Sequence, residues 1–567
     1  MPADRHTRAG QWARVLAGAR PRLYATGDRD VPPTTLQWPP MARDVSYITT
    51  PIYYVNDKPH IGHAYTTTVC DVYARFMRFA GRDVFFLTGT DEHGVRIEKV
   101  ACAQGITPQQ LADDNAAEFQ RVLPLLGSTN DDFIRTTEPR HTRRVQNLVQ
   151  RLVDAGVVYL GEFEGWYDEG QEEYIPQNKA KELGYKSPVN HKPLVRAKES
   201  NYYFRLSAFQ EKLGKLFHEQ PGFVRPEARR NEVLGRLREG LLDVPISRTN
   251  FTWGVPMPND PKHVIYVWID ALMNYVTALG LGEPDSDAFA QRGKYWPPEY
   301  HVIGKEILWF HAVIWPAILM ALDLPLPRCI YAHSFWIRDG QKMSKSLGNF
   351  IDLPTIQQYV DAYGLDAWRY YMATQGPLGA TDADFSAKHF HDIYTTDLVN
   401  TVGNCASRVA AMIGKYFDGA VPAETDGGSP RRIADHDWPA ICQRTVDQSR
   451  AAMEKLDLSG SIGAAVGLVR KVDAFINLTE PYKLAKDESR RDELGAILYQ
   501  CCEALRIASL LLWAVMPERV EQLWASLNQS IDPMTGTLQE LARWGGLQRG
   551  ASIQKLALFP RMEQPSV

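Results

Sequence analysis

The sequence lacks paired cysteines and long apolar runs. Its seven cysteines are scattered over 567 residues without a Cys-x-x-Cys spacing, and none lies between Cys102 and Cys329. A disulfide framework and a zinc knuckle built from cysteine pairs are therefore not expected. No stretch reaches the roughly 18 consecutive apolar residues that a transmembrane helix needs, so we expect no membrane partner. The length predicts three or four domains of roughly 100–200 residues each.

Acidic residues are nearly absent from the start of the chain, where Asp4 is the only carboxylate in residues 1–24. An arginine-rich, acid-poor start is typical of a mitochondrial transit peptide. We therefore predict a transit peptide at residues 1–24 and a mature protein in the mitochondrial matrix, with a disordered tail as the alternative. The segment Arg22-Leu23-Tyr24-Ala25 resembles a matrix-protease site that is cut after Tyr24. The arginines in this stretch are Arg5, Arg8, Arg14, Arg20 and Arg22.

Net positive charge is lacking as well. The formal net charge is −4, and removal of residues 1–24 takes away five positive charges and one negative charge, which leaves −8. So acidic a chain is not a general nucleic-acid binder. Any contact with RNA requires a localised basic face.

Strand-like and helix-like segments alternate over residues 45–127, which predicts a parallel sheet with ligands at the carboxyl ends of its strands. The alternation breaks near residue 128 and resumes with an apolar strand at His263–Trp268. The interval predicts an inserted domain, with an amphipathic helix from about Ser207 to Glu219. From about Ala387 to Val515, apolar residues recur with a period near 3.6, which predicts a bundle of long helices.

Two short motifs carry the chemistry. His60-Ile61-Gly62-His63 follows an apolar strand and opens a helix, so both imidazoles fall on one face of its first turn. There they add donors to backbone N–H groups that already suit an anion. Lys342-Met343-Ser344-Lys345-Ser346 lies far downstream on a loop and forms a movable cationic clamp. Together the motifs fit the release of pyrophosphate from a nucleoside triphosphate, although either motif alone could arise by chance.

In this order and context, the motifs resemble those of the class I aminoacyl-tRNA synthetases, and most closely the mitochondrial type of methionyl-tRNA synthetase. The likeness covers about residues 45–520. It implies that ATP, with Mg²⁺, activates L-methionine to methionyl-adenylate, and that methionine then passes to the 3′ end of tRNA(Met). Implied catalytic residues are His60, His63, Lys342 and Lys345. Implied ATP contacts are His60, Gly62, His63, Lys342, Met343, Ser344, Lys345 and Ser346.

The resemblance also implies a domain plan. The fold is α/β, with a Rossmann-like parallel-sheet catalytic domain interrupted by an inserted connective domain and followed by an α-helical anticodon-binding bundle. The expected segments are 45–127 and 243–335 for the catalytic halves, 128–242 for the insertion, 336–386 for the Lys-Met-Ser-Lys-Ser loop and stem-contact region, and 387–567 for the bundle.

The methionine pocket implied by the resemblance is largely aromatic. Sulfur packs favourably against aromatic edges, at about 0.3–1.5 kcal/mol per contact. Part of the pocket lies on an apolar helix from Glu306 to about Leu322, with a kink expected at Pro316. Aromatic residues at helical spacing that serve only as core are the alternative, and His311 alone is more typical of a core histidine. The implied residues are Ile52, Tyr54, Trp268, Ala271, Tyr275, Phe310, His311 and Trp315.

Two charged residues complete the implied substrate site. Asp91 follows a strand and matches the carboxylate that binds the methionine ammonium group. A helix N-cap is the alternative role for Asp91. Arg248 matches an arginine that the family places near the substrate carboxylate or the acceptor end.

Anticodon reading is assigned by the resemblance to the helical region. Asn404 and Arg408 are four residues apart and can reach splayed bases from one helix face. The family usually pairs proline with tryptophan in the partner segment, whereas this chain has Pro481 and Tyr482. Tyrosine offers less stacking area, so we expect weaker or shifted contacts. The alternative is a tyrosine that caps a bundle helix.

A second departure from the family concerns metal and assembly. The cysteine pairs that bind zinc in many relatives are absent from the insertion, and His191 alone cannot form a tetrahedral site. We therefore expect no structural zinc and an insertion held by packing. The chain ends soon after the bundle, which favours a monomer.

Three other functions compete with this interpretation. A non-catalytic RNA-binding protein on a synthetase scaffold would have lost a motif histidine or the second lysine, and both are present. A leucine or valine enzyme would carry a far larger insertion for editing, and a cysteine enzyme would carry an active-site zinc cluster. A simple nucleotidyltransferase would not need the helical C-terminal domain.

Overall fold

The computed structural model describes residues 44–55, 58–168, 173–175, 177–187, 191–338, 340–343, 348–423 and 436–565. The predicted transit peptide, 1–24, lies outside these residues. So do Ser344, Lys345 and Ser346 of the second motif.

The centre of the molecule is a seven-stranded sheet, and every strand pair in it is parallel, as predicted. Its order is β2-β3-β1-β13-β14-β8, with β4 also paired to β3. The chain order reverses between β3 and β13, on either side of β1, and such a reversal opens a crevice at the carboxyl ends of the strands. The strands are β1 (Val45–Thr49), β2 (Tyr53–Tyr54), β3 (Asp83–Asp91), β4 (Asp132–Arg135), β8 (Val224–Arg225), β13 (Tyr300–Gly304) and β14 (Ile330–His333).

Adjacent residues of these strands pack into two different cores. Ile48 and Phe86 belong to the core that contains α2 (Ile61–Phe79). Their neighbours Tyr47 and Phe85 belong to the core on the other face. Successive side chains of a strand point to opposite faces, so a sheet covered on both faces requires an unbroken apolar run. The sequence supplies a run of four apolar residues in β3, Val84–Leu87, and an adjacent apolar pair in β1, Tyr47 and Ile48.

Three short segments were placed incorrectly by the sequence pattern. β4 and β8 fall within the expected insertion, 128–242, but extend the main sheet. The predicted strand His263–Trp268 is also wrong in extent and partner. The strand there is β12 (Asp260–Ile265), in a small antiparallel sheet with β10 (Ser247–Arg248) and β11 (Pro256–Met257), and Trp268 lies on α9 (Val267–Leu272). β4 and β8, of four and two residues, are too short for their periodicity to be recognised.

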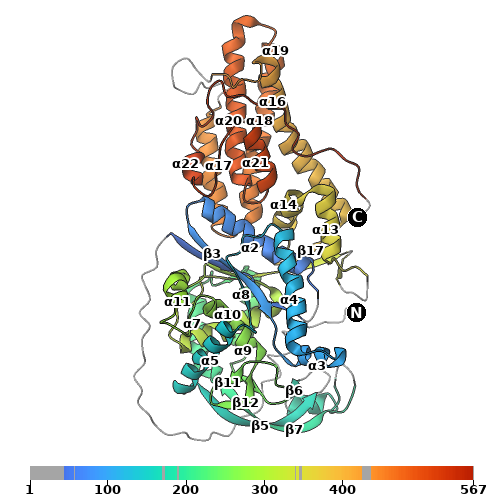
Figure 1. Cartoon of the computed structure of the whole chain (residues 1–567), viewed down its shortest axis with the longest axis vertical. Helices are drawn as coiled ribbons and strands as arrows, with labels where there is room; N and C mark the ends of the chain where they lie inside the picture. Colours follow the sequence, from blue (N-terminus) through green and yellow to red (C-terminus); the bar gives the residue numbers. More distant parts are fainter. Residues whose placement is uncertain are drawn as a thin grey trace.

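The inserted segment forms a separate antiparallel sheet of order β6-β5-β7-β9, at the bottom of Figure 1. Its strands are β5 (Val158–Asp168), β6 (Glu173–Ile175), β7 (Val195–Phe204) and β9 (Val244–Pro245). The predicted amphipathic helix is present as α7 (Gln210–Glu219), preceded by a 3₁₀ turn. The other α-helices between β3 and β14 are α3 (Val95–Gln104), α4 (Pro108–Leu125), α5 (Pro139–Asp154), α6 (Gln177–Glu182), α8 (Glu227–Leu237), α10 (Asn274–Thr277), α11 (Asp287–Arg292) and α12 (Trp315–Ala321).

A connecting region joins the sheet to the C-terminal helices. It contains a second small sheet of β15 (Trp336–Arg338), β16 (Gln341–Lys342) and β17 (Ala383–Asp384). The helices α13 (Leu353–Tyr363), α14 (Leu365–Gln375) and α15 (Ala387–Ile393) follow, and a π-helical segment, Tyr394–Gly403, leads into the bundle.

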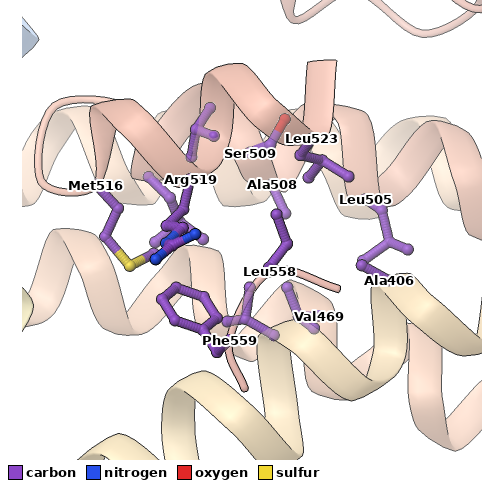
Figure 2. Close-up of a pocket in the computed structure, with 13 residues that line it drawn as sticks. Ala406, Val469, Leu505, Ala508, Ser509, Met516, Arg519, Leu523, Leu558 and Phe559 are labelled. Carbon is purple, nitrogen blue, oxygen red and sulfur yellow. The ribbon is translucent and has the colours of Figure 1, made fainter. Parts of the chain in front are cut away.

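The predicted helical bundle stands above the sheet in Figure 1. Its members are α16 (Asn404–Tyr416), α17 (Trp438–Met453), α18 (Leu458–Thr479), α19 (Pro481–Leu484), α20 (Arg491–Leu512), α21 (Pro517–Ser526) and α22 (Leu538–Leu541). Figure 2 shows Ala406, Val469 and Leu505 converging with Phe559 of the C-terminal segment, around a void of only about 10 Å³. Among the described residues, Glu488–Leu512 is long and apolar enough to cross a membrane by length and composition, but its most apolar window is wholly buried in the protein.

Candidate active site

A cavity of about 660 Å³ opens at the carboxyl edge of the main sheet. Its walls come from the ends of four neighbouring strands, because Ile52 follows β1, Asp91 ends β3, Gly304 ends β13 and His333 ends β14. Residues from both halves of the chain therefore meet there. The cavity brings together these residues singled out from the sequence: Ile52, Tyr54, His60, Gly62, His63, Asp91, Trp268, Ala271, Tyr275, His311 and Lys342.

The two motif histidines cap the first turn of α2 reciprocally. The Gly62 N–H donates to His60 Nδ1 at 3.0 Å, and the His60 N–H donates to His63 Nδ1 at 3.2 Å. The Ile61 N–H donates to the Ile351 carbonyl at 3.0 Å. The expectation that backbone N–H groups of this turn remain for an anion is therefore corrected. These amides are already used, and a phosphate would have to be bound by the imidazoles.

Both imidazoles are oriented to donate through Nε2. Because each Nδ1 accepts a hydrogen bond, the proton of a neutral ring resides on Nε2. Burial, and then the neighbouring His60, lower the pKa of His63 well below its ordinary value. The rings lie 3.9 Å apart, and His63 is held edge-on by Tyr53 and Phe119. A Cβ at position 62 would lie 2.9 Å from His60 Cε1, so glycine is needed there to seat the His60 ring.

Asp91 lines the cavity, and one oxygen of its carboxylate is unsatisfied. The side chain is nearly buried, and its Oδ1 has no hydrogen-bond partner within the described ranges. Burial, followed by the charge of Asp270, raises the pKa of Asp91 well above its ordinary value. The following helix, α3, begins after Gly94, so Asp91 is not its N-cap. A buried acceptor without a partner costs free energy, and a bound cation would remove that cost.

Trp268 and Tyr275 form an aromatic wall of the cavity. The indole of Trp268 stacks on Phe310, with ring centroids 4.0 Å apart and planes 8° from parallel. The Tyr275 hydroxyl lies 2.7 Å from His311 Nε2, and His311 Nδ1 lies 3.1 Å from the Ile307 carbonyl. Burial lowers the pKa of His311 to about 4. His311 is therefore a satisfied, neutral histidine that also lines the cavity.

Phe310 and Trp315 lie behind this wall and are not among the residues that line the cavity. Phe310 supports Trp268, and the Trp315 indole donates to His301 Nε2 at 3.3 Å. The helix expected from Glu306 is not regular. It contains a π-helical turn at Phe310–Ile314 immediately before Pro316, and α12 starts only at Trp315. Such turns recur at functional sites, and this one places His311 on the cavity side.

The second motif reaches the cavity through Lys342. This residue lies on β16, is exposed, and has its Nζ 5.4 Å from the Phe335 ring centroid. Met343 packs partly buried against the main core.

Several lining residues were missed by the sequence reasoning, among them Tyr53, Glu306, His333 and Phe335. Glu306 follows the end of β13, and burial raises its pKa above the ordinary value. His333 ends β14, and burial lowers its pKa to about 4. The apolar runs ahead of Glu306 and His333 were a usable signal, since ligand-binding residues follow strand ends in parallel sheets.

Arg248 lies outside the cavity lining. Its guanidinium carbon is 4.9 Å from the Tyr266 ring centroid, and one of its buried nitrogens has no hydrogen-bond partner in the part of the chain that the structure describes. Among the same residues, no group of three or more His, Cys, Asp or Glu side chains is arranged to hold a metal ion.

The predicted anticodon residues lie on α16 and at the start of α19, two helices labelled near the top of Figure 1. Asn404 is exposed. Arg408 is paired with Asp473 and donates to Asn477 Oδ1 at 3.1 Å. Tyr482 is 49 % exposed, and its hydroxyl donates to Glu480 at 2.9 Å. Pro481 is buried at the start of α19. The tyrosine ring is thus presented to solvent rather than packed as a cap.

Comparison with known proteins agrees with this geometry. The profile of the family described as tRNA synthetases class I (M) matches residues 46–183 and 184–410. The methionine–tRNA ligase of Streptomyces coelicolor is 45% identical over 534 residues, which is 91% of this chain and 97% of that protein. The ligase of Halalkalibacterium halodurans is 42% identical over 528 residues, 91% of this chain and 78% of that protein.

A solved structure of a methionyl-tRNA synthetase is also similar to this chain. Mycobacterium tuberculosis methionyl-tRNA synthetase in complex with methionyl-adenylate superposes with a TM-score of 0.80 and 37% identity, covering 91% of this chain and 100% of that one. The family match, the parallel sheet and the helical C-terminal region agree. The chain therefore belongs to the class I methionyl-tRNA synthetases and is a methionine–tRNA ligase.

Proposed function

We propose that the cavity holds L-methionine and ATP side by side and joins them as methionyl-adenylate, and that the chain performs this reaction for mitochondrial translation. The observation that carries the catalytic part is that Asp91, a buried carboxylate with one unsatisfied oxygen, lines the same cavity as the His60 and His63 imidazoles. The carboxylate suits an ammonium group, and the imidazoles suit phosphate oxygens.

The reaction needs electrostatic support more than covalent chemistry. A carboxylate oxygen of methionine attacks the α-phosphorus of ATP, the bond to the bridging oxygen breaks, and pyrophosphate leaves. Negative charge builds on the phosphates at that moment. In this proposal the Nε2–H groups of His60 and His63 donate to these oxygens, and Lys342 and Lys345 hold the β- and γ-phosphates. The 3′-terminal hydroxyl of tRNA(Met) then attacks the methionyl carbonyl, and AMP leaves.

Methionine is selected by the aromatic wall. Trp268 and Tyr275 face the cavity together with Ile52 and Ala271. A thioether gains about 0.3–1.5 kcal/mol per aromatic contact, whereas size alone separates side chains by about 1–3 kcal/mol per methylene. Contacts with both rings therefore favour methionine over leucine.

Mg²⁺ enters this proposal with ATP. The ion is small, keeps several waters and binds phosphate oxygens together with one or two carboxylates. Glu306 is the carboxyl group that lies in the cavity on the Lys342 side, where Lys305 and Lys342 also act on it. A carboxyl there suits either the ion or the ribose hydroxyls of ATP.

The proposed activity is tested by ATP–pyrophosphate exchange with each of the twenty amino acids. We expect methionine to support exchange and the other amino acids to give only background. Stronger exchange with leucine, valine or cysteine would overturn the assignment of the pocket. Absence of exchange with every amino acid would favour the non-catalytic RNA-binding alternative.

The mitochondrial part of the proposal rests on the five arginines and single acid of residues 1–24. The relatives named above are bacterial proteins. Sequencing the N-terminus of the protein purified from its own cells tests the proposal, and we expect a new terminus at Ala25 in the mitochondrial fraction. An intact Met1 terminus in the cytosolic fraction would refute it.

We further propose a monomer without structural zinc. Both catalytic halves of this chain contribute residues to the cavity. In the insertion, Ala180 and Leu194 form a small apolar core with Trp166 and Leu183 packed against it. Light scattering should give the mass of one chain, and elemental analysis should give no zinc. One tightly bound zinc per chain would contradict the second point.

Arg408 should matter for tRNA but not for amino-acid activation. The Arg408→Ala variant removes a cation whose charge acts on Tyr482, and an arginine that hydrogen-bonds to a base edge is worth about 1–3 kcal/mol. We expect charging of tRNA(Met) to fall about 5- to 150-fold in kcat/KM, with ATP–pyrophosphate exchange unchanged. Lys388→Ala, which removes an exposed cation on α15, is the matched control. An exchange defect as large as the charging defect would remove Arg408 from anticodon reading.

A further inference from the structure

Asp270 is a fully buried carboxylate next to the substrate cavity, but it does not line it. It lies on α9 between Trp268 and Ala271, which both do. Its oxygens face away from the cavity, toward His93 Nδ1 at 2.7 Å and His141 Nε2 at 2.8 Å. Burial alone would raise the pKa of Asp270, but the two histidines lower it to about 2.

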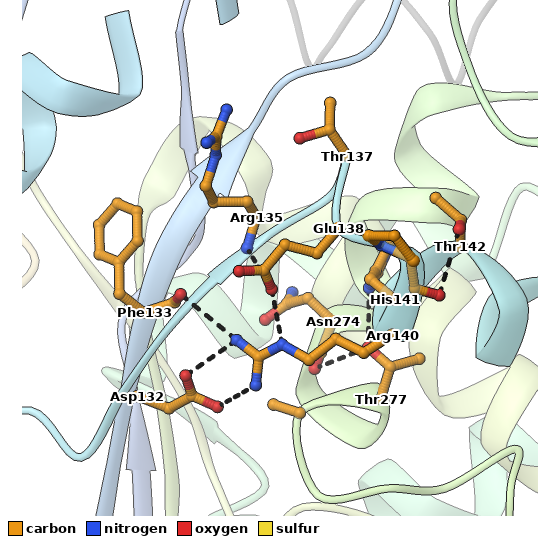
Figure 3. A network of polar contacts seen from close by, with 12 residues as sticks. Asp132, Phe133, Arg135, Thr137, Glu138, Arg140, His141, Thr142, Asn274 and Thr277 are labelled. Carbon is orange, nitrogen blue, oxygen red and sulfur yellow. Dashed lines mark hydrogen bonds and ion pairs between the residues drawn. The ribbon is translucent and has the colours of Figure 1, made fainter. Parts of the chain in front are cut away.

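The two histidines come from different parts of the fold. His93 stands two residues after Asp91 in the loop that leaves β3, and its ring lies edge-on to Trp253 at 5.4 Å. His141 lies on α5, and its Nδ1 is 2.7 Å from Thr277 Oγ1 on α10, as Figure 3 shows. Asp270 thereby joins the Asp91 loop, α9 and α5 through direct hydrogen bonds.

Glu92 fixes the same loop from the other side. It is fully buried and accepts from Arg135 at 2.7 and 3.0 Å and from Thr137 at 2.5 Å. The Trp253 indole donates to the Glu92 carbonyl at 2.7 Å. Both residues that follow Asp91 are therefore anchored, while Asp91 Oδ1 has no partner among the residues that the structure places.

The charges around Asp91 come from four elements. Glu92 and His93 lie on its own loop, Asp270 on α9, His141 on α5 and Arg135 on β4. Arg135 neutralises Glu92, whereas the negative charge of Asp270 acts on Asp91 and helps to raise the pKa of Asp91. The ionised form of Asp91 is thus costly in the empty cavity, and a bound ammonium group relieves that cost.

We propose that Asp270 is a positioning residue for the amino-acid substrate, which holds the Asp91 carboxylate through His93 and holds the aromatic wall through its own helix. The inference rests on the proposed function, because it assigns Asp91 to the methionine ammonium group. Asp270 itself touches no substrate. Its loss should therefore affect methionine and leave ATP nearly unaffected.

The test is steady-state ATP–pyrophosphate exchange by the full chain with Asp270→Asn. We expect the KM for methionine to rise about 10- to 100-fold, by analogy with the outer-shell groups that orient metal ligands, with the KM for ATP nearly unchanged. The low-pH limb of kcat/KM for methionine should move to lower pH, because a negative charge beside Asp91 is gone. A purely structural role would lower activity without moving that limb.

Two further variants keep the test decisive if Asp270→Asn does not fold. His93→Ala should likewise raise the KM for methionine and leave the KM for ATP nearly unchanged. His93→Gln, whose amide can still donate to Asp270, should restore most of the methionine affinity. Glu503→Gln removes another fully buried carboxylate, in the bundle. This variant should not raise the KM for methionine selectively over the KM for ATP.

Equal rises in both KM values for the folded Asp270 and His93 variants, with the pH limb in its original place, would overturn the inference. That result is distinct from failure of the proposed function, in which the unaltered chain would show no methionine-dependent exchange.

Discussion

Replacing Asp91 by asparagine should abolish most methionine activation. Removing one partner of a buried charge pair costs about 2–5 kcal/mol, so kcat/KM for methionine should fall roughly 30- to 5,000-fold. The expectation follows from the unsatisfied Oδ1 of Asp91 at the cavity wall. Methionine-dependent ATP–pyrophosphate exchange measures it. Asp287→Asn, at an exposed position on α11, is the matched control.

The pH dependence of the same reaction gives an independent check. The pKa of Asp91 is raised in the empty cavity by burial and then by Asp270. Only the ionised carboxylate attracts an ammonium group, so kcat/KM for methionine should decline as the pH falls through that raised pKa. Asp91→Asn has no carboxyl group to titrate and should lack this limb. If the variant binds methionine normally or keeps the limb, Asp91 is not the ammonium ligand.

Replacing Arg369 by alanine should strongly destabilise the fold. Arg369 is fully buried and donates to Asp71 on α2 at 2.7 Å, to the Leu126 carbonyl at 2.9 Å and to the Ala514 carbonyl at 2.9 Å. It therefore joins the helix that carries the histidine motif to the end of the bundle helix α20. Breaking a buried ion pair on one side costs about 3–5 kcal/mol, which urea unfolding would show as a lower midpoint.

The loss of unfolding free energy caused by Arg369→Ala should also depend on pH. Burial alone would raise the pKa of Asp71, but Arg369, Arg75 and Thr129 hold it below its ordinary value. A carboxyl group with a lowered pKa stabilises the fold above its unfolded pKa, and this contribution is lost as the pH falls through the folded pKa. The difference between the variant and the unaltered chain should therefore shrink in acid.

A matched control is Arg470→Ala, because Arg470 pairs with Asp397 but is 56% exposed. Exposed pairs are worth about 0–1 kcal/mol. Equal destabilisation by the Arg369 and Arg470 variants, or a constant difference at all pH values, would contradict the role given to Arg369.

The sequence was informative where residues follow long strands. Asp91 could be placed because β3 is nine residues long and contains the apolar run Val84–Leu87, and the histidine motif could be placed because it follows β1. Glu306 follows the end of a strand and His333 ends one, but no partner motif drew attention to them. Their contribution follows only from the parallel neighbours β13 and β14.

Other features depended on packing that no local pattern encodes. The capping of α2 by its own histidines requires the ring geometry of His60 and His63. The π-helical turn at Phe310–Ile314 moves Phe310 behind Trp268 while His311 reaches the cavity. β4 and β8 join the main sheet through pairing with distant strands. Such short elements are specified by tertiary contacts rather than by their own propensity.

The most direct measurement is a crystal structure of the chain with L-methionine and a non-hydrolysable ATP analogue. We expect the ammonium group within hydrogen-bond distance of Asp91 Oδ1, the thioether against Trp268 and Tyr275, and the phosphates beside the two motif histidines. Either ligand bound elsewhere, with this cavity left empty, would contradict the account.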